Sequence, residues 1–443
     1  MQKHVSTPTA PAALPRSLGC SAAAGPQAGS RPPVPAPLGD PGPLVRPRAI
    51  PTPNAASEDC PPAADCAGHA ASGPAASAPA PFVSVVVPVR NERGFVACCL
   101  DSILANDYPP ERLEVLVVDG LSDDGTRAVA ERYAARYPGV RVLDNPMKIT
   151  PAALNLGVRA ARGDVIVRCD AHARLAPDYI TQCVAWIGAS GADNVGGRMR
   201  TLPRGGGLGA QAVAAALGHR FGVGNSAFRT AAGEPRWVDT VFGGCYRREV
   251  FGRVGEFNER LPRGQDMEFN LRLKRAAGRT LLVPSIRCDY FARCDPRSFL
   301  AHSWTNGVWA VRPFVESEIV PVRPRHLVPL AFVLALGLAV AIWGAAHGLG
   351  LPQLRAVGLP SLGVEGLGPR PLLLLVTCYL AVALAASTQL AWRRRDAHIA
   401  LVLPAVFLSL HLAYGLGSAW GVVGAAATIV RRAIASAKRI NKR

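Results

Sequence analysis

The chain has few charged residues and lacks the cysteine spacings of a metal or disulfide scaffold. Charged residues make up only 18% of its 443 residues, and no CxxC pair occurs among the 11 cysteines. The missing CxxC spacing argues against a structural zinc site. Because Cys98 and Cys99 are adjacent and others fall in apolar segments, we expect free thiols in a reducing compartment.

Two further absences narrow the class of protein. The N-terminus has no apolar core of the kind found in signal peptides, so we expect no signal peptide. The formal net charge is +18, yet no dense Lys/Arg helix interleaved with aromatic residues occurs. We therefore expect no nucleic-acid partner. Basic residues instead flank apolar stretches near the C-terminus, which predicts contact with membrane lipids.

Residues 1–81 are rich in Pro, Ala, Gly and Ser and show no periodicity. Such a segment cannot bury enough apolar area to offset its ordering entropy, so we expect disorder. A wrongly assigned start codon is the alternative, because regular patterning begins only at Phe82.

Residues 82–320 alternate between strand-like and helix-like patterns, which predicts an α/β domain with a mostly parallel, Rossmann-like sheet. After Asp170 the pattern is less regular. The expected strands are 83–88, 114–118, 140–143, 164–169, 195–199, 240–246 and 280–283, and the expected helices are 95–104, 126–137, one from Pro151, and 266–277.

The region 321–430 changes to long apolar runs. Leu327–Ala346 and Pro371–Trp392 are each long enough to span a bilayer. Ile399–Val430 is too long for one span and contains four glycines, so we expect one span plus an interfacial helix, or a re-entrant hairpin. Buried helices of a soluble domain are the alternative, but three runs of this length rarely fit a soluble core.

Basic clusters predict the orientation of these helices. Arg323 and Arg325 precede the first run, Arg393–Arg395 follow the second, and 431–443 form a basic tail. The first two clusters agree with a cytoplasmic large domain. Three full spans would place the tail outside, which favours a hairpin or surface-lying element in the last run.

Four short motifs place polar residues where strands end or a helix begins. They are SVVVPVRNE (84–92), VVDGLSDDGT (117–126), RCDAH (168–172) and GQDMEF (264–269). Open α/β sheets bind ligands at the carboxyl ends of their strands. We therefore expect one site for a nucleoside diphosphate, a divalent metal and a general base.

The first two motifs suit donor binding. Glu92 could accept hydrogen bonds from a base or ribose and Arg90 could meet phosphate, although an ordinary turn capped by Asn91 is an equal alternative. Asp119 ends its strand, a recurring position for a ribose or base ligand. Asp123 and Asp124 are expected to serve the turn.

The last two motifs suit metal binding and proton transfer. Asp170 and His172 could point into one site, where Mg²⁺ prefers a few oxygen ligands plus phosphates and His also tolerates Mn²⁺. A loop acid and a surface His are the alternative. Asp266 and Glu268 begin a helix, where they could complement its dipole or supply a general base.

Together the motifs make the chain resemble the family-2 inverting glycosyltransferases of GT-A fold, especially the membrane-anchored enzymes of bacterial exopolysaccharide assembly of the succinoglycan type. The resemblance covers roughly 82–330 and continues into the apolar tail. The segments that carry it are PVRNE, VVDGLSDDGT, DNPMKITPAALNLG (144–157), RCDAH, ADNVGGRM (192–199), FGVGNSAFRT (221–230), VDTVFGGCYRREVF (238–251) and RGQDMEFNLRL (263–273).

The resemblance implies a role for each site residue. Asp266 would be the catalytic base, and Glu268 would have no separate duty. Asp170 would be the last acid of the metal-binding DxD element, with His172 near the metal or the acceptor and Mg²⁺ or Mn²⁺ as cofactor. The expected nucleotide-sugar ligands are Pro88, Arg90, Glu92, Asp119, Lys148 and Asp170.

The implied reaction is a single inverting displacement from a nucleoside diphosphate sugar, expected to be UDP-linked, to a polyprenyl-linked saccharide. The implied location is the inner membrane, multi-pass, with a cytoplasmic catalytic domain. Rival functions are a processive polysaccharide synthase, polyprenyl-phosphate glycosyl transfer, and a non-catalytic nucleotide-sugar-binding component. The synthase is disfavoured because no QxxRW string follows Asp266.

Overall fold

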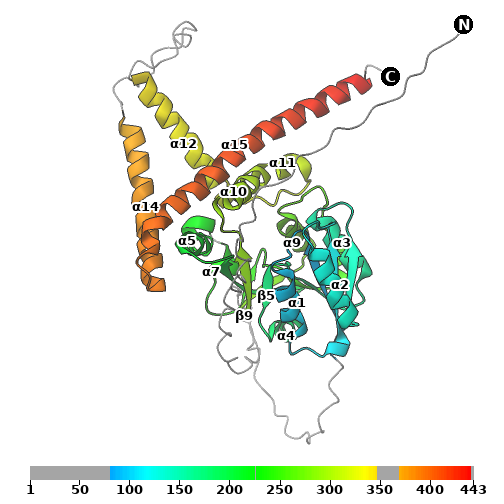
Figure 1. Ribbon diagram of the computed structural model, residues 1–443. Helices are drawn as coiled ribbons and strands as arrows, with labels where there is room; N and C mark the ends of the chain where they lie inside the picture. Colours follow the sequence, from blue (N-terminus) through cyan, green and yellow to red (C-terminus); the bar gives the residue numbers. More distant parts are fainter. Residues whose placement is uncertain (1–79, 225, 347–368, 441–443) are drawn as a thin grey trace, which may run out of the picture. The chain divides into compact units, whose positions relative to one another are not determined.

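A mixed nine-stranded sheet forms the centre of the domain that begins at residue 80 (Figure 1). The computed structural model describes residues 80–224, 226–346 and 369–440. The predicted disorder of 1–81 therefore lies almost wholly outside the described residues. The parallel part of the sheet has the order β3-β2-β1-β4, and its strands confirm the first four predicted ones. They are β1 Val83–Val89, β2 Leu113–Asp119, β3 Val140–Asp144 and β4 Val165–Arg168.

Alternation along these strands divides their side chains between two cores. Val85 and Val87 of β1 pack with α1 and α4, whereas Val86 packs on the other face with α3 and α9. The strands of a sheet that is buried on both faces have continuous apolar sequences, as these strands do. The covering helices are α1 Val96–Leu104, α2 Thr126–Arg136, α3 Thr150–Ala160, α4 Tyr179–Ser190, α8 Glu249–Val254 and α9 Gln265–Arg275, and the short turn η1 Pro110–Arg112 precedes β2.

The second half of the sheet is mixed rather than parallel. β8 is antiparallel to both β4 and β6, β6 and β9 are parallel, and β5 and β7 are antiparallel to β9. Strands outside βαβ units need no parallel crossover, which explains why regular alternation fades after Asp170. These strands are β5 Ala173–Leu175, β6 Asn194–Pro203, β7 Arg236–Val238, β8 Cys245–Arg247 and β9 Thr280–Ala292.

Three predicted strands have the wrong bounds, and the one predicted at 195–199 runs from Asn194 to Pro203. Of 240–246 only the end is a strand, because Gly243 and Gly244 adopt φ values of 67° and 99° that no strand contains. The strand predicted to end at Val283 continues to Ala292 after a register shift against β6. That extension carries polar residues, which hid it from a search for apolar runs.

The segment 208–316 also contains helices that the sequence analysis did not predict. Asp295 caps α10 by accepting a hydrogen bond from the Ser298 amide, 2.8 Å away. The α10 helix packs on both the sheet side and α15, so it shows little amphipathic periodicity. These helices are α5 Leu208–Ala216, α6 Arg220–Val223, α7 Ala227–Thr230, α10 Pro296–Val311 and α11 Pro313–Glu316.

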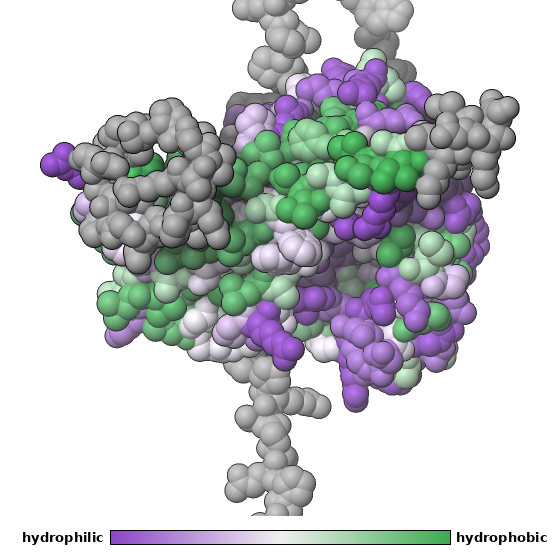
Figure 2. All heavy atoms as spheres, turned by 90° about the horizontal axis from the view of Figure 1, so that it is seen from above, coloured by the Kyte–Doolittle hydropathy of each residue, from purple (hydrophilic) through white to green (hydrophobic). Residues whose placement is uncertain are grey.

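Three C-terminal helices are long and apolar enough to cross a membrane: α12 Pro324–Ala346, α14 Arg370–Arg394 and α15 Ile399–Ile440. Figure 2 shows the face that carries them, where hydrophobic residues form a broad band. Leu334 of α12 and Trp420 of α15 are among the large apolar side chains that these helices leave exposed. Lipid rather than water is the solvent that suits such surfaces.

The prediction that the last apolar run breaks into two elements is wrong. It forms one continuous helix of 42 residues, α15, about 63 Å long at 1.5 Å per residue. That is about twice the ~30 Å thickness of bilayer hydrocarbon, so only part of α15 can lie in lipid. The basic residues of the tail begin within this helix, at Arg431.

The glycines of this run make a close helix crossing instead of a break. A Cβ at Gly417 would overlap the Trp304 carbonyl of α10, and one at Gly421 would lie 2.8 Å from the Val308 oxygen. Ser418 Oγ donates to the Gly307 oxygen across the same contact, at 3.1 Å. Small residues let helix backbones approach this closely, and α15 is thereby fixed to the α/β domain through α10.

Candidate functional site

A cavity of about 480 Å³ opens where β1 and β4 end and α9 begins. Its wall includes seven of the eight predicted site residues, drawn from motifs separated by up to 178 residues in sequence (266 − 88). The seven are Pro88, Arg90, Glu92, Lys148, Asp170, His172 and Asp266. This convergence is what parallel strands with aligned carboxyl ends produce.

Asp119 is the predicted site residue that does not line this cavity. Its side chain is fully buried, accepts hydrogen bonds from the Ser122 amide (3.1 Å) and hydroxyl (2.5 Å), and lies 3.8 Å from the Arg127 guanidinium. The next residue, Gly120, does line the cavity. Asp119 therefore stands directly behind the wall, and its ligand role remains a prediction.

Hydrogen bonds join the turn after β1 to the turn after β2, where Asp123 and Asp124 were expected to serve. Asn91 has φ 55° and its amide donates to Asp123 at 2.9 Å. Asp124 accepts from the Thr126 amide at 2.9 Å and from the Arg93 amide at 3.1 Å. These contacts fix the loop that carries Arg90 and Glu92.

Glu92 has internal partners in place of the free carboxylate expected for base or ribose binding. Its oxygens lie 3.2 Å from His172 Nδ1, 2.8 Å from Arg204 and 3.3 Å from Arg293. Burial alone would raise its pKa, but His172 and the two arginines outweigh burial and lower the pKa below 4.5. Glu92 therefore acts first as an anionic anchor for the cations around the cavity.

Arg168 joins the two acids with predicted chemical roles. Its guanidinium lies 3.0 Å from Asp170 Oδ1 and 3.2 Å from Asp266 Oδ2, and its side chain is only 8% exposed. Burial opposes the charge, but both carboxylates outweigh it and raise the pKa of Arg168. The sequence analysis gave this residue no role, although an arginine inside a buried strand is rare without a partner.

The N-terminus of α9 presents Asp266 to the cavity and withdraws Glu268. Gly264 adopts φ 76° before the helix, and Asp266 lies in its first turn, where the helix dipole favours a carboxylate. Glu268 is 4% exposed and pairs with Arg272 at 2.8 Å. This geometry agrees with the expectation that Glu268 has no separate chemical duty.

The residues present fit a divalent cation that is held jointly with a diphosphate. Within the described chain, no group of three or more His, Cys, Asp or Glu side chains could hold a metal alone. Arg168 bonds to Asp170 Oδ1 and leaves Oδ2 of the same carboxylate outside that contact. One carboxylate plus phosphate oxygens is a common ligand set for Mg²⁺. His172 directs Nδ1 towards Glu92, which leaves only Nε2 for any metal.

Cations missed by the sequence analysis complete the cavity wall. Arg263 donates to Asn306 at 2.8 Å, and burial together with Arg293 lowers its pKa. Burial, Arg263 and Arg293 lower the pKa of His302 to about 3, so His302 is neutral at pH 7. The basic wall suits a phosphate-bearing ligand.

Comparisons with known proteins agree on one family. The family model described as "Glycosyl transferase family 2" matches residues 84–255. Succinoglycan biosynthesis protein ExoA of Rhizobium meliloti is 30% identical over 59% of this chain and 82% of that protein. The dolichyl N-acetyl-alpha-D-glucosaminyl phosphate 3-beta-D-2,3-diacetamido-2,3-dideoxy-beta-D-glucuronosyltransferase of Methanococcus voltae is 26% identical over 51% of this chain and 72% of its own length.

Among solved structures, mannosyltransferase PcManGT from Pyrobaculum calidifontis, in complex with GDP-Man and Mn²⁺, is 22% identical to this chain. It has a TM-score of 0.48 and covers 77% of this chain and 87% of its own.

Proposed function

The chain belongs to glycosyl transferase family 2 and has a GT-A-like fold, and we propose that it transfers a sugar from a nucleoside diphosphate sugar to a polyprenyl-linked saccharide. The carrying observation is that Asp170, Asp266 and a basic wall meet in one cavity. Exopolysaccharide assembly is the setting that the succinoglycan relative supports. The Methanococcus relative is named for transfer to a dolichyl-linked sugar phosphate, and this name supports a lipid-linked acceptor.

Donor binding falls to the β1 and β2 side of the cavity. Arg90 and Lys148 are adjacent, with Arg90 Nη1 3.4 Å from the Lys148 carbonyl. Their cationic groups would pair with the diphosphate by charge-assisted hydrogen bonds. Pro88 and Gly120 form the wall beside them, and Asp119 lies behind it. Asp119 would bind a ribose or base after its hydrogen bond from the Ser122 hydroxyl breaks. UDP is the nucleotide we propose.

Asp170 would hold Mg²⁺ or Mn²⁺ together with the diphosphate oxygens, with His172 beside them. A bound divalent ion stabilises the negative charge that develops on a departing phosphate. Arg168 holds the Asp170 carboxylate in place through its Oδ1 contact, so this arginine would position the metal ligand.

Asp266 would act as the general base. Its carboxylate accepts the proton of the acceptor hydroxyl while that oxygen bonds to the anomeric carbon and the bond from that carbon to the diphosphate breaks. Attack from the face opposite the leaving group inverts the anomeric centre in one step. The Arg168 guanidinium, 3.2 Å from Asp266 Oδ2, holds this carboxylate at the cavity wall.

The proposed location is the bacterial inner membrane, multi-pass, with the catalytic domain in the cytoplasm. Its support is the three apolar helices and the arginines at 323, 325 and 393–395 that flank them. The site is lined in part by α10, which packs on α15, so it would then stand beside the bilayer, where a polyprenyl-linked acceptor is anchored.

The test is product formation by the purified full chain in detergent. Each nucleotide sugar is offered with a polyprenyl-diphosphate-linked saccharide and Mg²⁺ or Mn²⁺, with EDTA and bare polyprenyl phosphate as separate arms. We expect one donor to give a saccharide longer by one inverted residue, with loss of product in EDTA. Product only on bare polyprenyl phosphate would replace this proposal with polyprenyl-phosphate glycosyl transfer, and no product with any donor would contradict both.

A further inference from the structure

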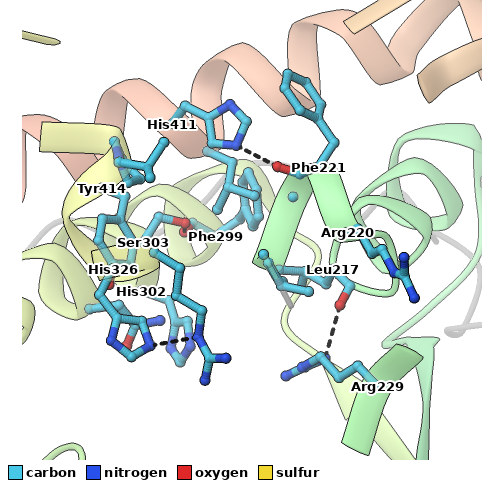
Figure 3. Close-up of a pocket in the computed structure, with 18 of the residues that line it drawn as sticks. Leu217, Arg220, Phe221, Arg229, Phe299, His302, Ser303, His326, His411 and Tyr414 are labelled. Carbon is cyan, nitrogen blue, oxygen red and sulfur yellow. Dashed lines mark hydrogen bonds between the residues drawn. The ribbon is translucent and has the colours of Figure 1, made fainter. Parts of the chain in front are cut away.

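A second cavity, of about 470 Å³, lies between the catalytic domain and the apolar helices (Figure 3). Its wall draws on α6, α10, α12, α14 and α15. Most of its residues lie outside the motifs that predicted the first cavity, which is called the donor cavity from here on. The chemistry of the second cavity is divided between a basic part and an apolar part.

The basic part contains arginines and histidines without acids. Among the described lining residues are four arginines (Arg220, Arg229, Arg293 and Arg325) and no carboxylate. Figure 3 shows Arg229 on one side of the cavity and the imidazoles of His302 and His326 on the other. An anion would therefore meet cationic or hydrogen-bonding groups from two sides.

Arg229 is bonded only to neutral groups among the described residues. Its Nη1 donates to Thr201 Oγ1 at 2.8 Å and to the Leu217 oxygen at 3.1 Å. Burial lowers its pKa, yet an arginine stays protonated in proteins. A part-buried guanidinium without a carboxylate partner is costly unless an anion from outside supplies one.

The apolar part faces the membrane helices. It is lined by aromatic and aliphatic side chains whose few polar groups are already paired: His411 lies 2.9 Å from both the Phe221 carbonyl and the Tyr379 hydroxyl. The ring of Phe332 stacks on Tyr379 with centroids 4.7 Å apart. The apolar lining includes Phe221, Val328, Phe332, Leu410 and Phe299.

The two cavities adjoin. Tyr290, Arg293, His302 and Asn306 line both of them. Arg293 also reaches Glu92, and Arg263 connects His302 and Asn306 to the donor side. A group bound at the basic part of the second cavity would therefore project its substituent towards Asp266.

We propose that this second cavity binds the isoprenoid (di)phosphate of the acceptor, with Arg229 on the phosphate and the aromatic wall around Phe332 on the first isoprene units. The assignment rests on the proposed function for the identity of the acceptor. An amphiphile with a compact dianionic head and an apolar chain matches the division of the wall. The saccharide on that phosphate then extends through the shared residues into the donor cavity.

Binding without any donor tests the site directly. Farnesyl diphosphate is titrated into the detergent-solubilised full chain, with inorganic pyrophosphate and phosphatidylglycerol as competitors. We expect R229Q to weaken farnesyl diphosphate binding about tenfold or more. R275Q, which removes an exposed arginine that lines neither cavity, is the matched control and is expected to bind as the parent does.

The outcomes separate this site from the proposed function. F332S is expected to weaken farnesyl diphosphate but not pyrophosphate, because it removes apolar contact only. Unchanged binding in R229Q, or equal competition by phosphatidylglycerol, overturns the site. D266N is expected to lose sugar transfer and to retain farnesyl diphosphate binding. If D266N loses transfer but R229Q binds farnesyl diphosphate as the parent does, the proposed function stands and the second cavity is rejected as the lipid site.

Discussion

At the scale of single residues, Glu92 shows how the site holds its charges together. One buried carboxylate contacts His172, Arg204 and Arg293, which come from three different segments. Removing one partner of a buried ion pair is costly because the remaining charges stay desolvated. Glu92 therefore contributes to stability as well as to the electrostatics of the cavity.

Glu92→Gln is expected to lower stability by about 3 kcal/mol at pH 7. Because the folded-state pKa of Glu92 is lowered below 4.5, its stabilisation is present above pH 4.5 and is lost as pH falls through the folded value. Thermal unfolding in detergent should show the parent and E92Q converging below pH 4.5. E131Q, at an exposed pair with Arg127, is the control. A gap that stays constant with pH would refute this role.

Glu268 is predicted to be structural although it stands two residues from Asp266. Glu268→Gln removes the buried carboxylate that pairs with the half-buried Arg272 at 2.8 Å, so we expect a loss of about 3 kcal/mol in stability. Transfer per folded molecule should stay within about twofold of the parent, because no lining residue of the donor cavity changes. A large fall in kcat with unchanged unfolding would instead assign chemistry to Glu268.

Sequence patterns found the acids of the site better than its cations. Asp170 and Asp266 were predictable because each stands at the end of a strand or the start of a helix in a recurring motif. Arg229 and Arg293 were not, because they come from a short helix and a loop whose contacts depend on tertiary packing. Arg168 was visible in the RCDAH string, but only the structure shows the carboxylates it joins.

At the scale of elements, the α10–α15 crossing connects the catalytic domain to the apolar helices. Gly307, Gly417 and Gly421 allow the two backbones to approach. The sequence suggested a broken helix because glycine has low helix propensity. Packing overrode that propensity, since each glycine is required by its neighbour across the crossing rather than by a turn.

Gly417→Leu should therefore destabilise the protein. A Cβ there would overlap the Trp304 carbonyl, and overpacking costs typically 1–3 kcal/mol, more against backbone. Gly337→Leu on α12 is the matched control, because a Cβ at Gly337 has no described atom within 4 Å. The measurement is the thermal midpoint in detergent; equal midpoints for the two variants would contradict the crossing.

At the scale of the whole molecule, the apolar helices and flanking arginines predict one orientation. Ala397 lies exposed between α14 and α15, next to the arginines at 393–395. A cysteine at Ala397 should react with a membrane-impermeant maleimide in inverted inner-membrane vesicles and not in intact cells, as should one at Asp107 on the catalytic domain. Each signal is read against the parent chain. Labelling of the two positions from opposite sides would reject the orientation.

The central claim is that Asp266 is the base of an inverting glycosyl transfer, and one assay tests it most directly. The parent, D266N and D107N, which changes an exposed acid bonded to Thr181, are compared for sugar transfer to the lipid-linked acceptor and for nucleotide binding. Loss of a general base costs about 10²–10⁴-fold in rate. We predict that loss for D266N alone, with nucleotide binding retained in all three. Transfer by D266N at the parent rate would contradict the account.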